Sequence, residues 1–308
     1  MDKDAKIYVA GHRGLVGSAI VRKLKSLGFE NILTATRNEL NLVDQKQTYQ
    51  FCQDHKPEYA YIAAAKVGGI HANDHYAADF IYNNLMIEGN LIHALYEANT
   101  KKALFLGSTC IYPKLAKQPL KEEYLLGGPL EETNEWYAVA KIAGIKLCQA
   151  YRKQHNADFI SAMPTNLYGQ GDNFDLETSH VLPALMRKIH EAKINSDEKV
   201  IVWGTGVPRR EFCHVDDCAD ACIFLMREYS SGEIVNIGVG LDLSITDLAQ
   251  LIKEVVGFNG DIEYDTNKPD GTPRKLVDVS KINDLGWQAK IPLREGLEHT
   301  YQWFLNNQ

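Results

Sequence analysis

The chain has 308 residues, 45% of them hydrophobic, and a formal net charge of -7 at pH 7. This length suggests one large domain or two interlocked domains. The acidic balance argues against nucleic-acid binding, while still allowing a local basic site for an anionic small molecule. No signal peptide and no membrane span are expected, because residues 1–6 are largely charged and no apolar run is long enough to cross a bilayer. We therefore expect a cytoplasmic protein whose six cysteines are reduced thiols.

The chain begins with a predicted strand, a glycine turn and a helix. The strand covers 6–10, the turn contains Gly11, Gly14 and Gly17, and the helix runs to about Leu27. At this place glycines let the backbone turn tightly, let a pyrophosphate approach, and let helix and strand pack closely. The sequence therefore predicts a dinucleotide site at the start of the first helix.

Arg37 follows the second predicted strand, near 32–36, where an NAD enzyme often carries a carboxylate for the ribose hydroxyl. A guanidinium at this position suits a 2′-phosphate, so NADP(H) is the favoured cofactor, with Arg13 as a second contact. The alternative is a solvent-exposed arginine at the end of a strand.

A long predicted helix follows a polar helix that ends at His55, a third strand at 59–63 and a loop at 66–70. It runs from about Tyr76 to Asn99 and is apolar over much of its circumference, so it needs cover on more than one side. One side is expected to pack on the sheet. The other side, together with a helix at 136–155, is expected to meet a second subunit in a homodimer. The alternative is cover by loops of the same chain.

The fourth predicted strand, 103–106, is an apolar run that delivers Ser108 and Cys110 to its carboxyl end. Open α/β sheets place their chemistry at such ends. On the next helix, Tyr137 and Lys141 are four residues apart and share one face. An ammonium beside Tyr137 is expected to lower the pKa of the phenol, which can then exchange a proton with a carbonyl oxygen that Ser108 also hydrogen-bonds. The alternative is a strand, a turn and an ordinary amphipathic helix.

Strands and helices alternate up to Gly169, with a further strand at 158–163, and this pattern predicts a parallel sheet covered on both faces. Beyond Gly169 the elements become shorter. The fold class is α/β, a Rossmann-type doubly wound parallel sheet with a smaller C-terminal α/β substrate-binding domain. We assign 1–169 to an NADP-binding Rossmann domain, with 211–240 returning to the sheet, and assign 170–210 and 241–308 to the substrate-binding domain.

Cys213, His214, Cys218 and Cys222 raise the question of a metal site. The helical pattern over 215–226 favours small buried side chains instead, so we expect no metal.

Six segments, in order along the chain, carry a resemblance to a known family. They are Gly-His-Arg-Gly-Leu-Val-Gly at 11–17, Ser-Thr-Cys-Ile-Tyr-Pro at 108–113, Trp-Tyr-Ala-Val-Ala-Lys at 136–141, Pro-Thr-Asn-Leu-Tyr-Gly at 164–169, Arg-Glu-Phe-Cys-His-Val-Asp-Asp at 210–217 and Lys-Pro-Asp-Gly-Thr-Pro-Arg-Lys at 268–275. Together they resemble the GDP-L-fucose synthases, which are extended short-chain dehydrogenases/reductases. The resemblance covers nearly the whole chain. It implies a usually homodimeric enzyme that uses NADPH and a GDP-sugar substrate.

The resemblance also implies roles for named residues. Ser108, Tyr137 and Lys141 match the family's catalytic triad, and Cys110 and His180 match its epimerisation pair. The implied cofactor contacts are Gly11, His12, Arg13, Gly14, Leu15, Val16, Gly17, Arg37, Lys141, Pro164, Thr165, Asn166, Leu167 and His180. The implied contacts to the GDP-sugar are Lys188, Trp203, Arg210 and Asp270.

The implied reaction converts GDP-4-keto-6-deoxy-D-mannose to GDP-L-fucose in two stages. A ketone at C4 acidifies the protons on C3 and C5, so Cys110 as base and His180 as acid are expected to invert both centres. Ser108 and Tyr137 are expected to stabilise the charge on the C4 oxygen. NADPH is then expected to reduce C4 while Tyr137 supplies the proton.

The sequence departs from many relatives at three places: Thr109 replaces a serine, Lys188 an arginine, and Asp175-Leu176-Glu177 a loop that often carries His-Pro. The nearest alternative function is an NAD-dependent nucleotide-sugar 4-epimerase or 4,6-dehydratase of the same fold. A dehydratase needs an acidic pair after the serine position, where this chain has Thr109 and Cys110. A second alternative is a non-catalytic NADP(H)-sensing regulator, which the presence of Ser108, Tyr137 and Lys141 disfavours.

Overall fold

The structure is a computed structural model that describes residues 1–268 and 270–307, without the side chains of Ile70 and His71. Within the described residues, the main sheet has six parallel strands in the order β2-β1-β3-β4-β5-β9. In chain order these are β1 (Ile7–Ala10), β2 (Ile32–Leu33), β3 (Tyr59–Ile62), β4 (Lys102–Leu106), β5 (Asp158–Pro164) and β9 (Val235–Ile237). The predicted α/β class with a parallel central sheet is confirmed.

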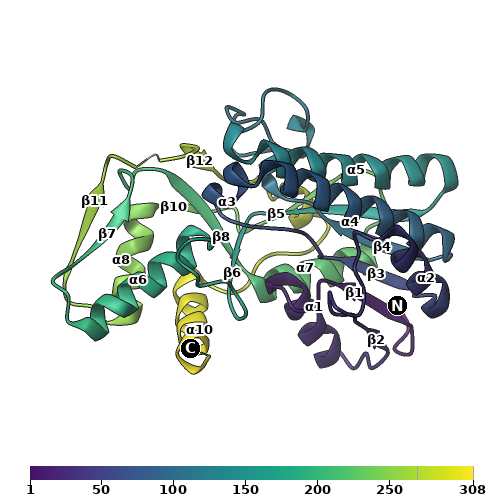
Figure 1. Cartoon of the computed structure of the whole chain (residues 1–308), viewed down its shortest axis with the longest axis horizontal. Coiled ribbons are helices and arrows are strands. Elements are labelled where there is room, and N and C mark those ends of the chain that lie inside the picture. The colour runs from purple at the N-terminus through teal and green to yellow at the C-terminus, as the bar shows by residue number, and fades with distance from the viewer. Residues whose placement is uncertain (269, 308) are drawn as a thin grey trace.

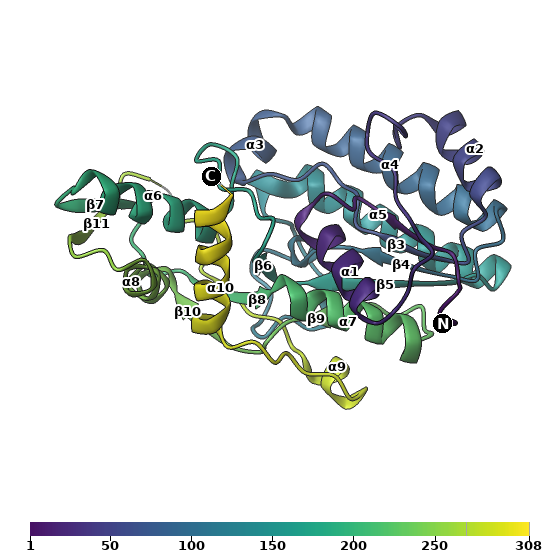
Figure 2. The ribbon, with the colours of Figure 1, turned by 90° about the horizontal axis from the view of Figure 1, so that it is seen from below.

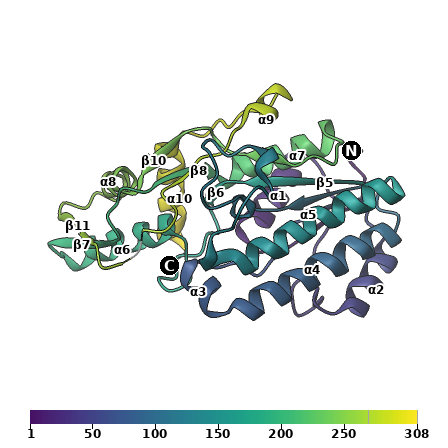
Figure 3. The same ribbon diagram turned by 90° about the horizontal axis from the view of Figure 1, so that it is seen from above.

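Helices cover both faces of this sheet (Figures 2 and 3). On one face lie α2 (Gln45–His55), α4 (Ala77–Glu97) and α5 (Glu135–His155); on the other lie α1 (Leu15–Ser26) and α7 (Val215–Glu228). Their apolar stripes form two separate cores, one including Leu91 and Ile145, the other including Ile20 and Leu225. The central strands β1 and β4 are buried along their whole length, which explains why they read as continuous apolar runs.

The helices on this face, α2, α4 and α5, begin close to the residues that the sequence predicted. Asp44 accepts a hydrogen bond from the Gln47 backbone N–H at 3.0 Å and so begins α2. A short helix, α3 (Ile70–His75), precedes α4 and begins at the end of the predicted 66–70 loop. The long helix predicted from Tyr76 to Asn99 is therefore α4, with its start and end each shifted inward by one or two residues.

A smaller unit follows β5 and forms the left-hand part of Figure 1. Its core is built by three helices, α6 (Val181–Asn195), α8 (Ile245–Val256) and α10 (Leu293–Asn306), packed on short strands. The strands β6 (Asn166–Tyr168), β8 (Arg209–His214), β10 (Asp242–Ser244) and β12 (Arg274–Lys275) pair together, whereas β7 (Lys199–Trp203) pairs with β11 (Asp261–Asp265). The short helix α9 (Ser280–Asp284) lies beside β9 (Figure 2).

Two elements of this unit differ from the sequence expectation. No strand was predicted at residues 209–214, yet they form β8, which pairs with β6, β10 and β12. The segment 245–256, expected as short elements and loops, is the helix α8, which a capping box of Ser244 and Asp247 begins.

Glu211 joins the smaller unit to the main sheet. It is fully buried, and its Oε1 accepts the backbone N–H of Val239 at 2.6 Å and of Gly240 at 2.7 Å. Its Oε2 accepts the Val277 N–H at 2.9 Å. One carboxylate on β8 therefore holds the segment that follows β9 and the segment that follows β12, and so fixes the approach of the two units.

The buried cysteines belong to the core. Cys213, Cys218 and Cys222 are fully buried on β8 and α7. In the part of the chain that the structure describes, no group of three or more His, Cys, Asp or Glu side chains is arranged to hold a metal ion. None of the helices in the described ranges is long and apolar enough to span a bilayer.

Candidate active site

Gly11 and Gly14 lie between β1 and α1, as the sequence predicted, whereas Gly17 lies in the first turn of α1. Gly11 has φ +83°, and a Cβ on Gly17 would lie 2.1 Å from the Gly11 carbonyl oxygen, so both positions require glycine. A Cβ on Gly14 would meet only that same oxygen, at 3.4 Å. The absence of a side chain on Gly14 therefore leaves room for a ligand to approach the backbone closely. Gly14 begins α1, whose first turn has neither a side-chain cap nor an acidic residue. This arrangement suits a pyrophosphate group at the N-terminus of α1.

A cavity of about 270 Å³ lies beside this turn. It is lined by Gly11, His12, Arg13, Gly14, Ala35, Thr36, Arg37 and Asn38. The guanidinium-bearing residues Arg13 and Arg37 thus line one cavity, although the segment that carries Arg37 continues beyond the two-residue strand β2 as irregular chain. Two arginines at the ribose end of a dinucleotide site are suited to a 2′-phosphate.

Ser108 and Cys110 lie directly after β4, at the carboxyl edge of the main sheet. Residues Thr109–Ile111 form a short 3-10 helix, and the Ser108 hydroxyl oxygen accepts the Cys110 backbone N–H at 3.4 Å. Burial raises the pKa of the Cys110 thiol, while the hydrogen bond from Ser108 and the positive charges of Lys275 and Lys141 oppose that rise. Cys110 is therefore a protonated thiol in the free protein.

Tyr137 and Lys141 lie one turn apart on α5, as their spacing predicted. The Lys141 Nζ is 5.7 Å from the centroid of the Tyr137 ring, but it is 2.8 Å from the Glu88 Oε1 on α4. The expectation that Lys141 lowers the Tyr137 pKa is wrong for this structure. Burial raises the pKa of Tyr137 well above its ordinary value, and the charges of Cys110 and Glu88 raise it further. Tyr137 is a protonated phenol at neutral pH.

His180 immediately precedes α6, at its N-cap position. The residue is exposed to solvent on one side. Desolvation by the protein around it and the positive charge of Lys275 lower its pKa. The imidazole is therefore neutral at pH 7. In the free protein the thiol and the imidazole together hold one titrating proton, on the sulfur of Cys110.

Lys275, on β12, is the residue that links these groups. Its charge acts on both Cys110 and His180, and it also interacts with Arg210 and Glu131. Sequence reasoning placed Lys275 in a family segment but gave it no role. The sequence offered one signal for Lys275, a lysine next to Arg274 in a polar loop that contains glycine and proline. Only the fold shows that Lys275 lines the same cavity as Cys110.

The four predicted GDP-sugar contacts form two neighbouring pairs. Lys188 places its Nζ 4.9 Å from the centroid of the Trp203 ring, which is 60% exposed. Asp270 accepts the Thr205 backbone N–H at 2.7 Å and its hydroxyl at 2.8 Å, and the charge of Asp270 acts on Arg210. The turn after Trp203 therefore joins the two pairs. Pro269, next to Asp270 in the family segment 268–275, lies outside the described residues.

The space beside Cys110 is small in this structure. A cavity of about 10 Å³ lies between the Thr109–Lys114 segment and the Thr272–Lys275 segment. That volume matches about one water molecule. This cavity is therefore too small to hold a sugar ring.

Comparisons with known proteins place this geometry in a family. Residues 7–238 match the NAD dependent epimerase/dehydratase family. GDP-L-fucose synthase 1 of Arabidopsis thaliana is 62% identical over 306 residues, which are 99% of this chain and 95% of that protein. The chain belongs to the GDP-L-fucose synthase family. The GDP-L-fucose synthase of Escherichia coli strain K12 is 53% identical and covers 98% of this chain and 97% of its own.

A solved structure supports the same membership of the GDP-L-fucose synthase family. A GDP-L-fucose synthetase from Naegleria fowleri, bound to NADP, has a TM-score of 0.92 at 30% identity and covers 100% of this chain and 96% of that chain. The resemblance drawn from the six sequence segments is confirmed. The protein is an enzyme of the NAD(P)-dependent epimerase/reductase type, whereas the roles of its individual residues remain predictions.

Proposed function

We propose that this enzyme converts GDP-4-keto-6-deoxy-D-mannose to GDP-L-fucose with NADPH, inverting C3 and C5 and then reducing the C4 ketone. The observation that carries the proposal is the electrostatic connection among the reactive groups. One ammonium, Lys275, acts on both Cys110 and His180, and Cys110 in turn acts on Tyr137. These interactions, and the cavity that Cys110 and Lys275 line together, support the placement of the groups for both stages in one site.

The first stage depends on the C4 ketone. Loss of a proton from C3 or C5 gives an enolate whose charge lies on the C4 oxygen. The hydroxyls of Ser108 and Tyr137 can each donate a hydrogen bond to that oxygen, which stabilises the developing charge. A donor that is already protonated, as Tyr137 is in this structure, suits this role.

Cys110 and His180 are our proposed proton-transfer pair. The expected division, with Cys110 as base and His180 as acid, requires the thiolate–imidazolium form. The free protein favours the thiol and the neutral imidazole. Both forms hold the same number of protons. The pH dependence of the rate therefore reports the pKa values of the pair, and either form gives the same bell-shaped curve. Cys110 as base therefore acts through the minor form, in which the Lys275 ammonium favours the thiolate but opposes the imidazolium.

The second stage requires a proton at the C4 oxygen. A nicotinamide cofactor held by the glycine turn and by Arg13 and Arg37 would supply the hydride that reduces C4. Tyr137, whose pKa is raised, holds the proton that the new hydroxyl needs. NADPH is our proposed cofactor because Arg13 and Arg37 line one cavity at the predicted ribose end of the dinucleotide site.

We propose that Lys188, Trp203, Arg210 and Asp270 bind the GDP portion of the substrate. The exposed ring of Trp203 offers a flat apolar surface to a base. Burial lowers the pKa values of Lys188 and Arg210, and partial desolvation of cations strengthens their attraction for a diphosphate. GDP-sugars appear in the names of the relatives at 53–62% identity, which supports the choice of nucleotide.

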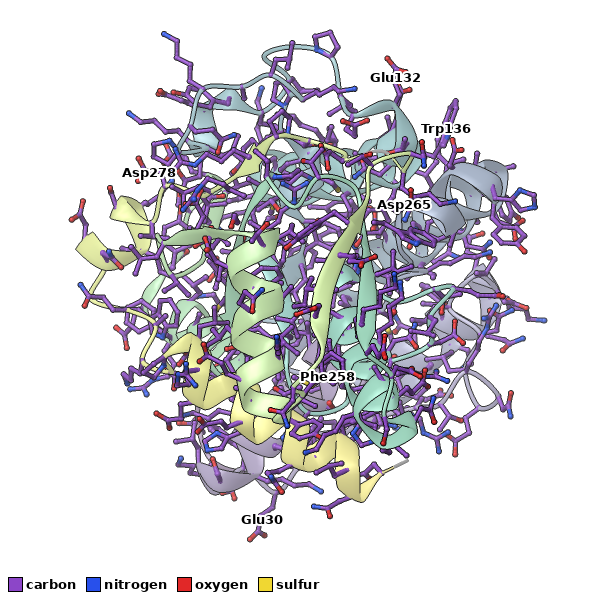
Figure 4. All side chains as sticks on the ribbon, turned by 90° about the vertical axis from the view of Figure 1, so that its left-hand side faces the viewer. Glu30, Glu132, Trp136, Phe258, Asp265 and Asp278 are labelled. Carbon is purple, nitrogen blue, oxygen red and sulfur yellow. The ribbon has the colours of Figure 1, made fainter. Side chains whose placement is uncertain are left out.

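A homodimer formed through α4 and α5 is part of the proposal. These two helices lie side by side on one flank of the molecule (Figure 3). They expose large apolar side chains to solvent: Tyr82, Leu85, Trp136 and Val139. Trp136 projects outward at the start of α5 (Figure 4). Sedimentation of the purified protein at micromolar concentration is expected to give the mass of two chains.

One assay tests the proposed function. NADPH oxidation is followed with GDP-4-keto-6-deoxy-mannose and, at equal concentration, with its UDP and dTDP counterparts. We expect rapid oxidation only with the GDP compound. A purified protein saturated with tightly bound NAD and inactive in this assay would instead support the 4-epimerase or 4,6-dehydratase alternative.

A further inference from the structure

Glu88 is a buried carboxylate that the sequence prediction did not use. It lies in the middle of α4, and its side chain is 2% exposed, as is that of Lys141. The Glu88 Oε1 is 2.8 Å from the Lys141 Nζ, and the Glu88 Oε2 has no hydrogen-bond partner among the described residues. The surroundings include an aromatic ring, because the Lys141 Nζ also lies 4.6 Å from the centroid of the Phe105 ring. Burial raises the pKa of Glu88, and the charge and hydrogen bond of Lys141 oppose that rise, so the carboxylate form depends on its pairing with Lys141.

The fold makes room for this carboxylate. Gly144 lies on α5 one turn after Lys141, and a Cβ there would be 2.8 Å from the Glu88 Oε2 and 2.4 Å from the Phe105 Cζ. A larger residue at 144 is therefore incompatible with the observed position of the Glu88 side chain. The contact between α4 and α5 is shaped around the ion pair.

Titratable groups on three elements face Tyr137 and the ion pair. Cys110 approaches from the segment after β4 and Glu88 from α4, and both raise the Tyr137 pKa. Lys141 and Cys148 lie on α5 itself. The charge of Glu88 raises the pKa of Cys148, and the charge of Lys141 lowers it. The Lys141 ammonium beside Tyr137 is thus matched by a carboxylate at 2.8 Å.

We propose that Glu88 is a positioning residue for the reduction: its buried carboxylate, 2.8 Å from the Lys141 Nζ, orients and offsets the charge of the ammonium that lies 5.7 Å from the centroid of the Tyr137 ring. This inference rests on the proposed function, because it gives Glu88 a role in the reductive stage. Without Glu88, the ammonium acts on Tyr137 unopposed, and the phenol loses its proton at lower pH. The acid form needed for reduction is then lost at lower pH as well.

The test substitutes Glu88→Gln, which removes the charge and keeps the size of the side chain. We expect the alkaline limb of kcat/KM for NADPH oxidation to move to lower pH by about one unit. In the free protein, the ¹³C resonance of the Tyr137 Cζ, assigned by its loss in Tyr137→Phe, is expected to titrate at lower pH. Glu88→Asp, which retains the charge, is expected to restore much of the wild-type profile.

Glu97→Gln is the matched control, because Glu97 lies at the exposed end of the same helix. It is expected to leave both profiles unchanged. A Glu88→Gln enzyme that is uniformly slower at every pH, or a Tyr137 resonance that titrates as in wild type, would overturn the inference. If Glu88→Gln does not fold, Glu88→Asp must show a smaller shift in the same direction, and an unshifted profile overturns the proposal.

The free-protein titration also separates this inference from the proposed function. It requires neither substrate nor cofactor. A wild-type protein that fails to oxidise NADPH with the GDP-sugar contradicts the proposed function, while the Tyr137 titration in Glu88→Gln still decides the role of Glu88.

Discussion

Tyr137 is the residue on which reduction depends most directly. Its raised pKa makes it a proton donor, and Ser108 can also hydrogen-bond the C4 oxygen during epimerisation. Tyr137→Phe is expected to lower the rate of NADPH oxidation by about 10²- to 10⁴-fold, the usual contribution of a positioned acid. Exchange of the C3 and C5 protons with D₂O, followed by NMR, is expected to retain much of its wild-type rate.

The control for this prediction is Tyr49→Phe, because Tyr49 is exposed on α2. It is expected to change neither reaction. Equal loss of reduction and of proton exchange in Tyr137→Phe would show that Tyr137 has a structural role or serves both stages equally.

Lys275 controls the pH range of the proton-transfer pair. Its positive charge lowers the pKa of Cys110 and also that of His180. Lys275→Met removes this charge, so both pKa values rise. Both limbs of the pH profile for C3 and C5 exchange are therefore expected to move to higher pH, as measured by NMR in D₂O buffers. Limbs that stay in place would mean that Lys275 does not face this pair.

The positions of Ser108, Cys110, Tyr137 and Lys141 at one strand end and on one helix face followed from local pattern. The protonation state of Tyr137 did not, because it depends first on burial of the phenol and then on Cys110 and on Glu88, which is distant in sequence and meets Lys141 only when α4 packs on α5. A carboxylate within the apolar stretch of a long helix was the available signal, and only packing reveals its partner.

The contact between α4 and α5 leaves no space at Gly144. Gly144→Ala gains helix propensity but forces its methyl group against Phe105 and Glu88. Overpacking of this kind typically costs about 1–3 kcal/mol. Urea unfolding is expected to show a lower free energy of unfolding by roughly that amount.

Gly89→Ala on α4 is the matched control, since no atom lies within 4 Å of a Cβ at that position. The same substitution there is expected to be neutral or to stabilise by up to about 1 kcal/mol through helix propensity. A Gly144→Ala protein as stable as wild type would show that the two helices separate more easily than their packing indicates.

The elements themselves were predictable where one pattern dominated. The buried strand β4 and the helices α2, α4 and α5 begin and end close to the predicted residues, because apolar periodicity and caps act locally. The strand β8 was missed because it starts with Arg209 and Arg210, whose place in a sheet depends on pairing with β10 and β12. Such pairing is a property of the whole fold.

At the scale of the whole molecule, the two units meet at the site. Glu211 anchors β8 to the segments after β9 and β12, and these carry the smaller unit to the edge where Cys110 and Tyr137 lie. His180 and Lys275 come from the smaller unit, whereas Cys110 and Tyr137 come from the main-sheet unit. The combined reaction therefore depends on the correct approach of both parts, which the order of motifs along the chain does not specify.

The central claim is that one site performs two epimerisations and one reduction. It is tested most directly by letting the enzyme act on GDP-4-keto-6-deoxy-mannose with NADPH in D₂O and analysing the product by mass spectrometry and NMR. We expect GDP-L-fucose that carries solvent deuterium at C3 and at C5, and protium from NADPH at C4. A reduced product without solvent deuterium at C3 and C5, and with the configuration of the substrate at both carbons, would contradict the account.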